Sequence, residues 1–222
     1  MNDLNFFQFV ASRYEELLGL TLQHIQITGL AVLLAILLGV PVGIWISKNK
    51  KIRSPILGIA NIFQTIPSLA LFGLIIPLLG TGYVPSVFVL FLYALLPIIK
   101  NTFIGINSVD EAIIDAGRGM GMTSKQILTK VEIPLALPVI MGGIRISTVI
   151  NIGTATIAAL IGAGGLGEMI FKGISMASNN MVLAGAVPTA LLAISVDKLL
   201  GMFETKLTPE GITSQKDDVQ NK

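Results

Sequence analysis

The feature that most constrains this chain is the distribution of its charges. No Asp, Glu, Lys or Arg occurs between Glu16 and Lys48, or between Arg53 and Lys100. One helical crossing of a bilayer needs about 20 consecutive apolar residues. The first interval is therefore long enough for one crossing, and the second for two. The composition agrees, because 53% of the 222 residues are hydrophobic and only 13% are charged.

These intervals and two later apolar segments predict an all-α integral membrane protein with about five transmembrane helices. The spans are expected at 26–47, 56–79, 85–105, 137–161 and 181–202. Gly80-Thr81-Gly82 separates the second span from the third, and Pro85 suits the first turn of the next helix. Residues 1–19 then form an extracellular N-terminal segment. Residues 203–222 form a polar tail, expected to be disordered from Glu204 onward.

Basic residues predict the orientation of these spans, because cytoplasmic loops are enriched in Lys and Arg. Four of them follow the first span: Lys48, Lys50, Lys51 and Arg53. With five crossings, this places the N-terminus outside the cell and the C-terminus inside. The 106–133 loop then also lies in the cytoplasm, and its basic residues agree. We therefore expect a multi-pass protein of the cell membrane, in contact with the lipid bilayer.

Several classes of function are not supported by the residues. The chain has no cysteine, so disulfides and thiolate metal sites are excluded, and its net charge of +2 gives no argument for nucleic acid. It has no Walker loop, no metal-ligand cluster and no nucleophile–base pattern, so we expect neither an enzyme nor a cofactor site. Gly162-x-Gly164-x-x-Gly167 matches the dinucleotide pattern. We expect a tight turn there instead, because the motif ends a span and no strand–helix unit surrounds it.

The segment 106–133 mixes acids with bases and predicts an aqueous loop that contains two short helices. Ser108 with Glu111, and Thr123 with Gln126, have the spacing of capping boxes at helix starts. Between them, Gly117, Gly119 and Gly121 can supply a turn with positive φ. Pro134 is expected to stop the second helix. The prediction is a helix–glycine–helix hairpin beneath the membrane.

The first helix of this hairpin carries an apolar stripe at helical spacing: Ala112, Ile113, Ala116 and Met120. Such a stripe needs something to pack against. From the residues alone, two interpretations stay open. The hairpin packs on its own membrane domain, or its stripe docks another protein.

The same loop resembles a known family motif. Asp115-Ala116-Gly117, then Gly121, then Ile133-Pro134 is similar to the "EAA" loop of ABC importer permeases, with Asp for Glu, Gly for the second Ala, and Val131-Glu132-Ile133 for Ile-x-Leu. The resemblance implies a type-1 permease domain over 20–202 and docking of a separate cytosolic ATPase, which would hold the ATP and Mg. The residues implied in this coupling are Glu111, Asp115, Ala116, Gly117, Gly121, Ile133 and Pro134.

Further stretches resemble the permeases for quaternary amines such as glycine betaine, carnitine and choline. They are Gln64–Leu71, Glu111–Gly121, Ile133–Ile140, Gly143–Arg145 and Ile161–Gly167. The resemblance implies an extracellular solute-binding protein and a second permease, either a copy or a paralogue. Two alternatives remain: a permease of this fold for methionine or another amino acid, and an ATPase-independent channel or scaffold. The hairpin disfavours the last, because a channel would not need it.

Polar residues within the spans have two interpretations. Gln64, Thr65, Asn151 and Thr154, together with Pro67, either line the solute path or serve helix–helix packing and hydrogen bonding. Arg145 is expected to snorkel to the interface or to pair with an acid of the loop. His24 is expected at the outer interface. Gly39-x-x-x-Gly43 is a candidate for close helix packing.

Overall fold

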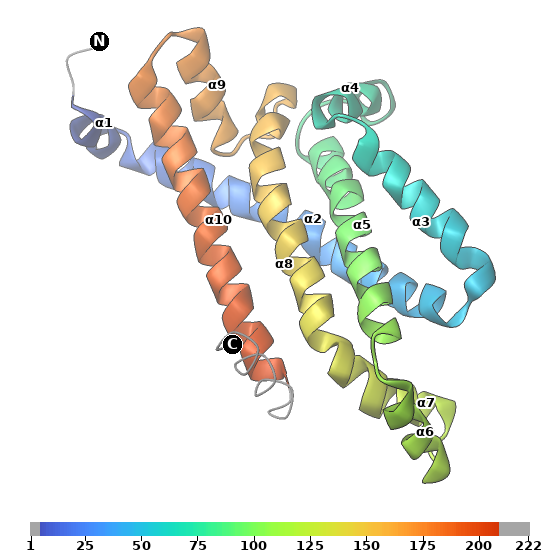
Figure 1. Ribbon diagram of the computed structural model, residues 1–222. Helices are drawn as coiled ribbons and strands as arrows, with labels where there is room; N and C mark the ends of the chain where they lie inside the picture. Colours follow the sequence, from blue (N-terminus) through green and yellow to red (C-terminus); the bar gives the residue numbers. More distant parts are fainter. Residues whose placement is uncertain (1–4, 209–222) are drawn as a thin grey trace.

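The computed structural model describes residues 5–208, and all regular structure within that range is helical (Figure 1). The elements are α1 (Phe6–Ser12), α2 (Tyr14–Lys48), α3 (Lys50–Thr65), α4 (Ser68–Leu79), α5 (Tyr83–Asn107), α6 (Glu111–Gly119), α7 (Ser124–Ile127), a π-helix (Leu128–Glu132), α8 (Ile133–Ala158), a 3₁₀ turn (Ala159–Ile161), α9 (Gly167–Ser175) and α10 (Asn179–Leu207).

Four stretches in the described range are each long and apolar enough to cross a bilayer: α2, α5, Ser124–Ile161 and α10. They contain the first, third, fourth and fifth predicted spans, which the structure therefore confirms as helices. All four extend beyond the predicted bounds at one end or both. Helix α10 reaches Leu207, so 204–207 is helical rather than disordered, and the rest of the predicted tail, 209–222, lies outside the described residues.

The second predicted span, 56–79, is not one helix. Helices α3 and α4 meet at an angle of 100°. Ile66 lies between them with ψ 127°, because the ring of Pro67 disfavours helical backbone at the preceding residue. The break is tied to α5: the Tyr93 hydroxyl donates to the Ile66 carbonyl, and Gln64 Nε2 donates to the Tyr93 carbonyl at 3.3 Å. Backbone groups freed inside a membrane need such partners.

Counted as one span, the broken pair gives the fifth crossing. Helix α3 has 16 residues, which is about 24 Å at 1.5 Å per residue. It rises beside α5, and α4 lies across its far end (Figure 1). The crossings therefore leave α1 and the end of α10 at opposite ends of the bundle. Which end faces the cytoplasm stays a prediction from the basic residues.

Glycines let the central helices approach closely. A Cβ on Gly43 of α2 would lie 2.5 Å from the Cβ of Thr102 on α5, and one on Gly105 would lie 3.0 Å from the Ala136 carbonyl oxygen of α8. A Cβ on Gly39 would lie 2.9 Å from Ile98. The predicted packing motif of α2 is thus used against α5. The other face of α2 exposes leucines, as a lipid-facing surface does.

The end of the bundle opposite the 106–133 loop is built around the glycine-rich turn 162–167. Gly162, Gly164 and Gly165 all have positive φ, as expected for a tight turn. The Gly82 N–H donates to the Ile161 carbonyl at 2.7 Å, and the Gly165 N–H donates to Gln23 Oε1 at 3.1 Å. The residues that follow form α9, a short helix between the predicted fourth and fifth spans.

His24 belongs to this packed region. Its side chain is fully buried, and Nε2 donates to the Ile152 carbonyl of α8 at 2.9 Å. The side chain therefore faces the protein interior, and its depth in the bilayer stays a prediction. The sequence could not show that α8 presents a carbonyl at this point.

Candidate coupling site

Helix α6 begins two residues later than a Ser108 cap would place it. Ser108 ends α5, and its hydroxyl donates to the Gly105 carbonyl at 2.9 Å. The cap is Asp110, whose Oδ1 accepts from the Ala112 N–H at 2.9 Å. The predicted Ser108–Glu111 capping box is therefore wrong. Glu111 is the first residue of the helix, where its charge favours the positive end of the helix dipole.

The hairpin turn is a Schellman motif centred on one glycine. Gly121 has φ +80°, its N–H donates to the Arg118 carbonyl at 2.9 Å, and the Met122 N–H donates to the Gly117 carbonyl at 3.1 Å. This is the 6→1 and 5→2 pattern that closes helix ends with a left-handed glycine. Gly117 and Gly119 lie inside α6 and not in the turn. The predicted positive φ is confirmed only at Gly121.

The second arm begins with the predicted capping box. The Gln126 N–H donates to Thr123 Oγ1 at 3.3 Å, and the Thr123 N–H donates to Gln126 Oε1 at 2.8 Å. Pro134 does not end this arm, because the chain passes through the π-helix directly into α8. The proline nitrogen lacks the proton that an α-helix would use here, and a π-turn re-routes the neighbouring hydrogen bonds. The Ile133 N–H accordingly donates to the Leu128 carbonyl.

An ion pair joins the π-helix to the end of α2. The Glu132 side chain is 5% exposed, and it accepts from Lys48 Nζ at 2.6 Å. Eighty-four residues separate the partners in sequence. The sequence did not predict this pair. The signals for it were an acid two residues before Pro134 and the basic cluster that follows the first span. The pair ties the base of the hairpin to the first span.

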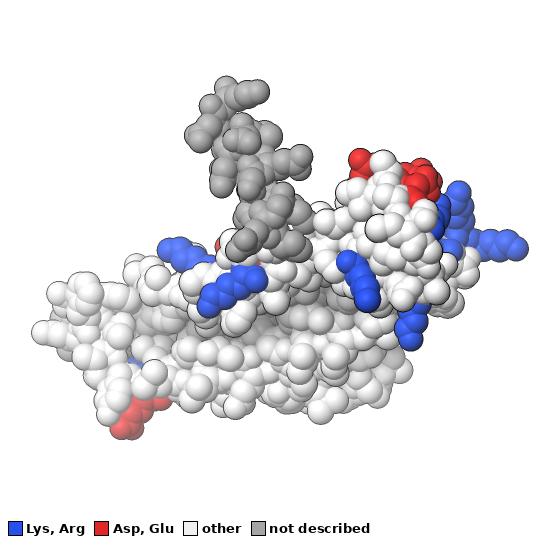
Figure 2. Space-filling model, turned by 90° about the horizontal axis from the view of Figure 1, so that it is seen from below, with Lys and Arg blue, Asp and Glu red and all other residues white. Residues whose placement is uncertain are grey.

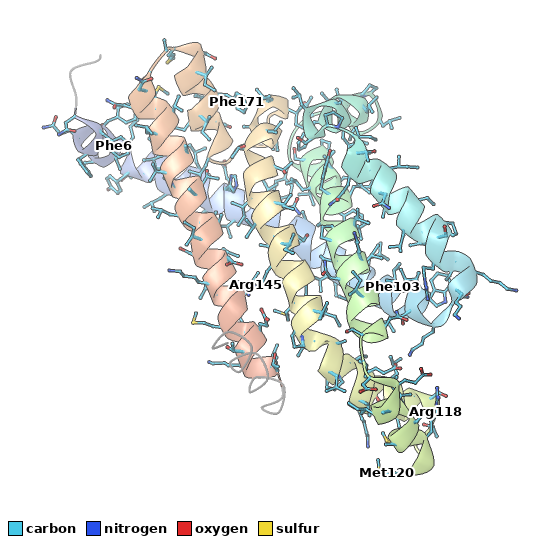
Figure 3. All side chains as sticks on the ribbon, in the orientation of Figure 1. Phe6, Phe103, Arg118, Met120, Arg145 and Phe171 are labelled. Atoms are coloured by element: carbon cyan, nitrogen blue, oxygen red, sulfur yellow. The ribbon has the colours of Figure 1, made fainter. Side chains whose placement is uncertain are left out.

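The apolar stripe of α6 faces outward. Ile113 is 46% exposed and Met120 is 76% exposed, and Ala112 and Ala116 are exposed as well. The helix packs instead at buried Gly117, against Met122 and Ile127. Arg118 and Met120 lie at the tip of the hairpin, away from the bundle (Figure 3). Packing on the chain's own membrane domain therefore does not account for the stripe.

Arg145 bridges α8 and α10 in the half of the bundle nearer the hairpin (Figure 3). Its guanidinium holds Asp197 through Nε and Nη2 at 2.9 and 3.0 Å, and Glu204 through Nη1 at 2.8 Å. The predicted partner in the coupling loop is therefore wrong. The sequence signal for the observed pairing was the presence of two acids, Asp197 and Glu204, in and just after the last predicted span.

The candidate solute-path residues come from two places in the fold, the break between α3 and α4 and the middle of α8. Gln64, Thr65 and Pro67 lie at the break between α3 and α4, where Thr65 and Pro67 are exposed. Asn151 is fully buried in α8, and Thr154 donates to the Ile150 carbonyl of its own helix. The hydrogen bonds of Gln64 and Asn151, to Tyr93 and Ser147, are to backbone carbonyls.

A bundle of membrane-spanning helices with a helical hairpin at one end is the fold of permease subunits of ABC importers. The inward-facing methionine ABC transporter MetNI contains a chain of this fold, with a TM-score of 0.79 at 23% identity, covering 87% of this chain and 96% of that one. A choline transport permease of Bacillus subtilis is 46% identical over 95% of this chain and 97% of its own length. An osmoprotectant import permease of Salmonella typhimurium is 51% identical over 88% and 94%.

The family model described as "binding-protein-dependent transport system inner membrane component" matches residues 30–209. This chain belongs to that family. It is the multi-pass permease subunit of an ABC importer in the cell membrane, a transport component rather than an enzyme. Such a system includes an ATPase and a substrate-binding protein.

Proposed function

We propose that this permease carries quaternary-amine osmolytes and that helix α6 docks the ATPase that drives it. The relatives in support are named for choline, carnitine, glycine betaine and osmoprotectants, at 44–51% identity over most of the chain. The observation that carries the docking role is the outward-facing stripe of α6. ATP and Mg bind to the partner ATPase, and a second permease, identical or paralogous, completes the pathway.

The coupling residues divide into two roles in this proposal. Ala116, on the exposed stripe, touches the ATPase, and Glu111 and Asp115 flank it. Gly117, Gly121, Ile133 and Pro134 hold the hairpin in shape and join it to α8. The Lys48–Glu132 pair passes its displacement to α2, so that a lever motion of the hairpin reaches two spans.

Ala116→Glu tests the docking role. A carboxylate in a desolvated contact costs a few kcal/mol, which weakens binding about a hundredfold or more. We expect normal membrane levels, loss of the co-purifying ATPase and loss of uptake. Ala116→Ser, and Ser175→Glu at the opposite end of the bundle, are the matched controls. Full co-purification of the ATPase with Ala116→Glu would refute the docking role.

Uptake by the assembled importer tests the solute class. Cells without other osmolyte importers should accumulate labelled glycine betaine, carnitine or choline only when this permease and its partner proteins are present. Unlabelled methionine should not compete. Competition by methionine alone would favour the second candidate, an amino-acid permease, whose support is the likeness of fold to the methionine transporter.

Cysteine labelling tests the orientation. The chain has no cysteine, so Lys50→Cys and Asn179→Cys each give a single reactive thiol. A membrane-impermeant reagent added to intact cells should label the second and spare the first. The reverse pattern would place the hairpin outside the cell, where no ATPase could reach it.

A further inference from the structure

An apolar groove runs along α2 and α5 on the side flanked by α3. Its part nearer the hairpin has a volume of about 240 Å³ between α2, α3 and α5. The part beyond it has a volume of about 530 Å³, and Leu38 lines both. Every residue that lines the two parts is apolar, and they include Val42, Ile56 and Ile99. Such a groove in a bilayer fits an acyl chain.

Basic side chains without acidic partners lie at the hairpin end of this groove. Lys50 and Lys51 are exposed at the start of α3, and neither forms an ion pair within the described range. Arg53 comes one turn before Ile56, and its guanidinium carbon lies 4.5 Å from the centre of the Phe103 ring. Its Nε is buried and has no hydrogen-bond partner in the described chain. Figure 2 shows basic side chains gathered on this end of the molecule.

We propose that this end of the groove binds an anionic phospholipid. The phosphate takes the charges of Lys50, Lys51 and the Arg53 guanidinium, whose buried Nε–H gains a partner when the side chain turns toward the phosphate. An acyl chain follows the groove past Ile56 and Val42. The N-terminus of α3 adds its positive dipole to the same place. Arg53, whose guanidinium lies over the Phe103 ring, presents a fork suited to phosphate oxygens. The Lys48 ammonium is paired with Glu132, whereas these three cations have no acidic partner in the described chain and can bind a phosphate.

Trp45 offers a reporter for this site. It is the only tryptophan of the chain, is 56% exposed, and lies one turn from Val42 on α2. Phosphatidylglycerol with brominated acyl chains should quench it more than phosphatidylcholine labelled in the same way. The assembled importer is used, and a Trp45→Phe version subtracts the tryptophans of its partners. The ratio of the two quenching curves gives the preference for the anionic lipid.

We expect this preference to fall about fivefold for each of Lys50→Gln, Lys51→Gln and Arg53→Gln. Arg53→Lys keeps the charge but loses the flat fork, so it should lose part of the preference. Lys198→Gln and Lys206→Gln remove charges from α10 and should change nothing. Ala60→Phe, which fills the groove, should reduce quenching by both lipids, whereas Ile62→Phe on the exposed side of α3 should not.

Three outcomes would overturn the site. An equal loss of preference in the α10 variants would mean general surface attraction. Full preference in Arg53→Gln would mean that Arg53, the residue at the mouth of the groove, has no part in binding. Disulfide cross-linking between two permeases through Lys50→Cys would mean that a second copy, and not a lipid, covers the groove.

Discussion

The two ends of the bundle are held together by different means. At the hairpin end, ion pairs join distant segments: Lys48 with Glu132, and Arg145 with Asp197 and Glu204. At the opposite end, the described ion pairs are local ones within a turn of helix, such as Lys172 with Glu168. There the long-range contacts are close approaches at glycines and the buried hydrogen bond from His24 to the Ile152 carbonyl.

The difference shows in what a side chain would meet at each glycine. A Cβ on Gly167 would lie 2.0 Å from the Thr156 carbonyl oxygen, and one on Gly164 would lie 2.4 Å from Gln23 Oε1. At the hairpin, Gly119 and Gly121 have open space around them. We infer that the glycine turn is a rigid closure between α2, α5 and α8, whereas the hairpin is a projecting lever whose position depends on charges at its base.

Gly167→Ala should destabilise the protein strongly, because its new methyl group would overlap the backbone of Thr156, which cannot move aside. We expect a loss of about 3 kcal/mol or more, seen as low membrane levels and early unfolding of the purified protein. Gly153→Ala is the control, since a Cβ there meets nothing within 4 Å. A stable Gly167→Ala protein would show that the Gly167 and Thr156 backbones can separate and that the glycine turn is not rigid.

Lys48→Met tests the ionic base of the hairpin. It leaves the Glu132 carboxylate, only 5% exposed, without its cation, at a cost of about 1–3 kcal/mol. Glu132→Gln should cost less, because the Lys48 side chain is 47% exposed and can turn to water. The double variant should then be more stable than Lys48→Met alone. Thermal unfolding of the three proteins measures this order, and equal losses in the two single variants would contradict it.

These contacts also show how far the sequence could predict the molecule. The spans and the Gly121 turn were predictable, because charge-free length and glycine conformation are local properties. The break at Ile66 was signalled by Pro67, but other prolines, such as Pro41 in α2, sit inside unbroken helices. What decides between these outcomes is a tertiary partner such as the Tyr93 hydroxyl.

Within the candidate site, the same limit applies. Helical spacing predicted the apolar stripe of α6. Whether the stripe is exposed could not be predicted, because it depends on which face of the helix packs against the second arm of the hairpin, here the face at Gly117. The partners of Arg145 lie 52 and 59 residues away, and the partner of Glu132 lies 84 residues away. Charge type alone cannot select a partner at such separations.

Gly121→Val tests the hairpin through its backbone alone. A β-branched residue at φ +80° is strained by about 1–2 kcal/mol, although there is open space for its side chain. We expect the bundle to stay folded while uptake and solute-stimulated ATP hydrolysis fall together. Gly121→Asn, which tolerates left-handed backbone, should retain most of both. Normal uptake with Val at this position would mean that the turn does not need to hold its shape.

Gly119→Ala should have the smallest effect, and of the opposite sign. Gly119 ends α6 in ordinary helical backbone, with nothing within 4 Å of a new methyl. Alanine restricts the unfolded chain, so we expect a gain of about 0.5 kcal/mol in stability. Gly117→Ala is the variant to compare with it, because its methyl group would lie 3.3 Å from Met122 Sδ. The flexible methionine side chain can move aside to make room for it. If Gly119→Ala instead abolishes uptake at normal membrane levels, the ATPase must contact the hairpin so closely at Gly119 that a methyl group there does not fit. The contact surface would then extend beyond the stripe.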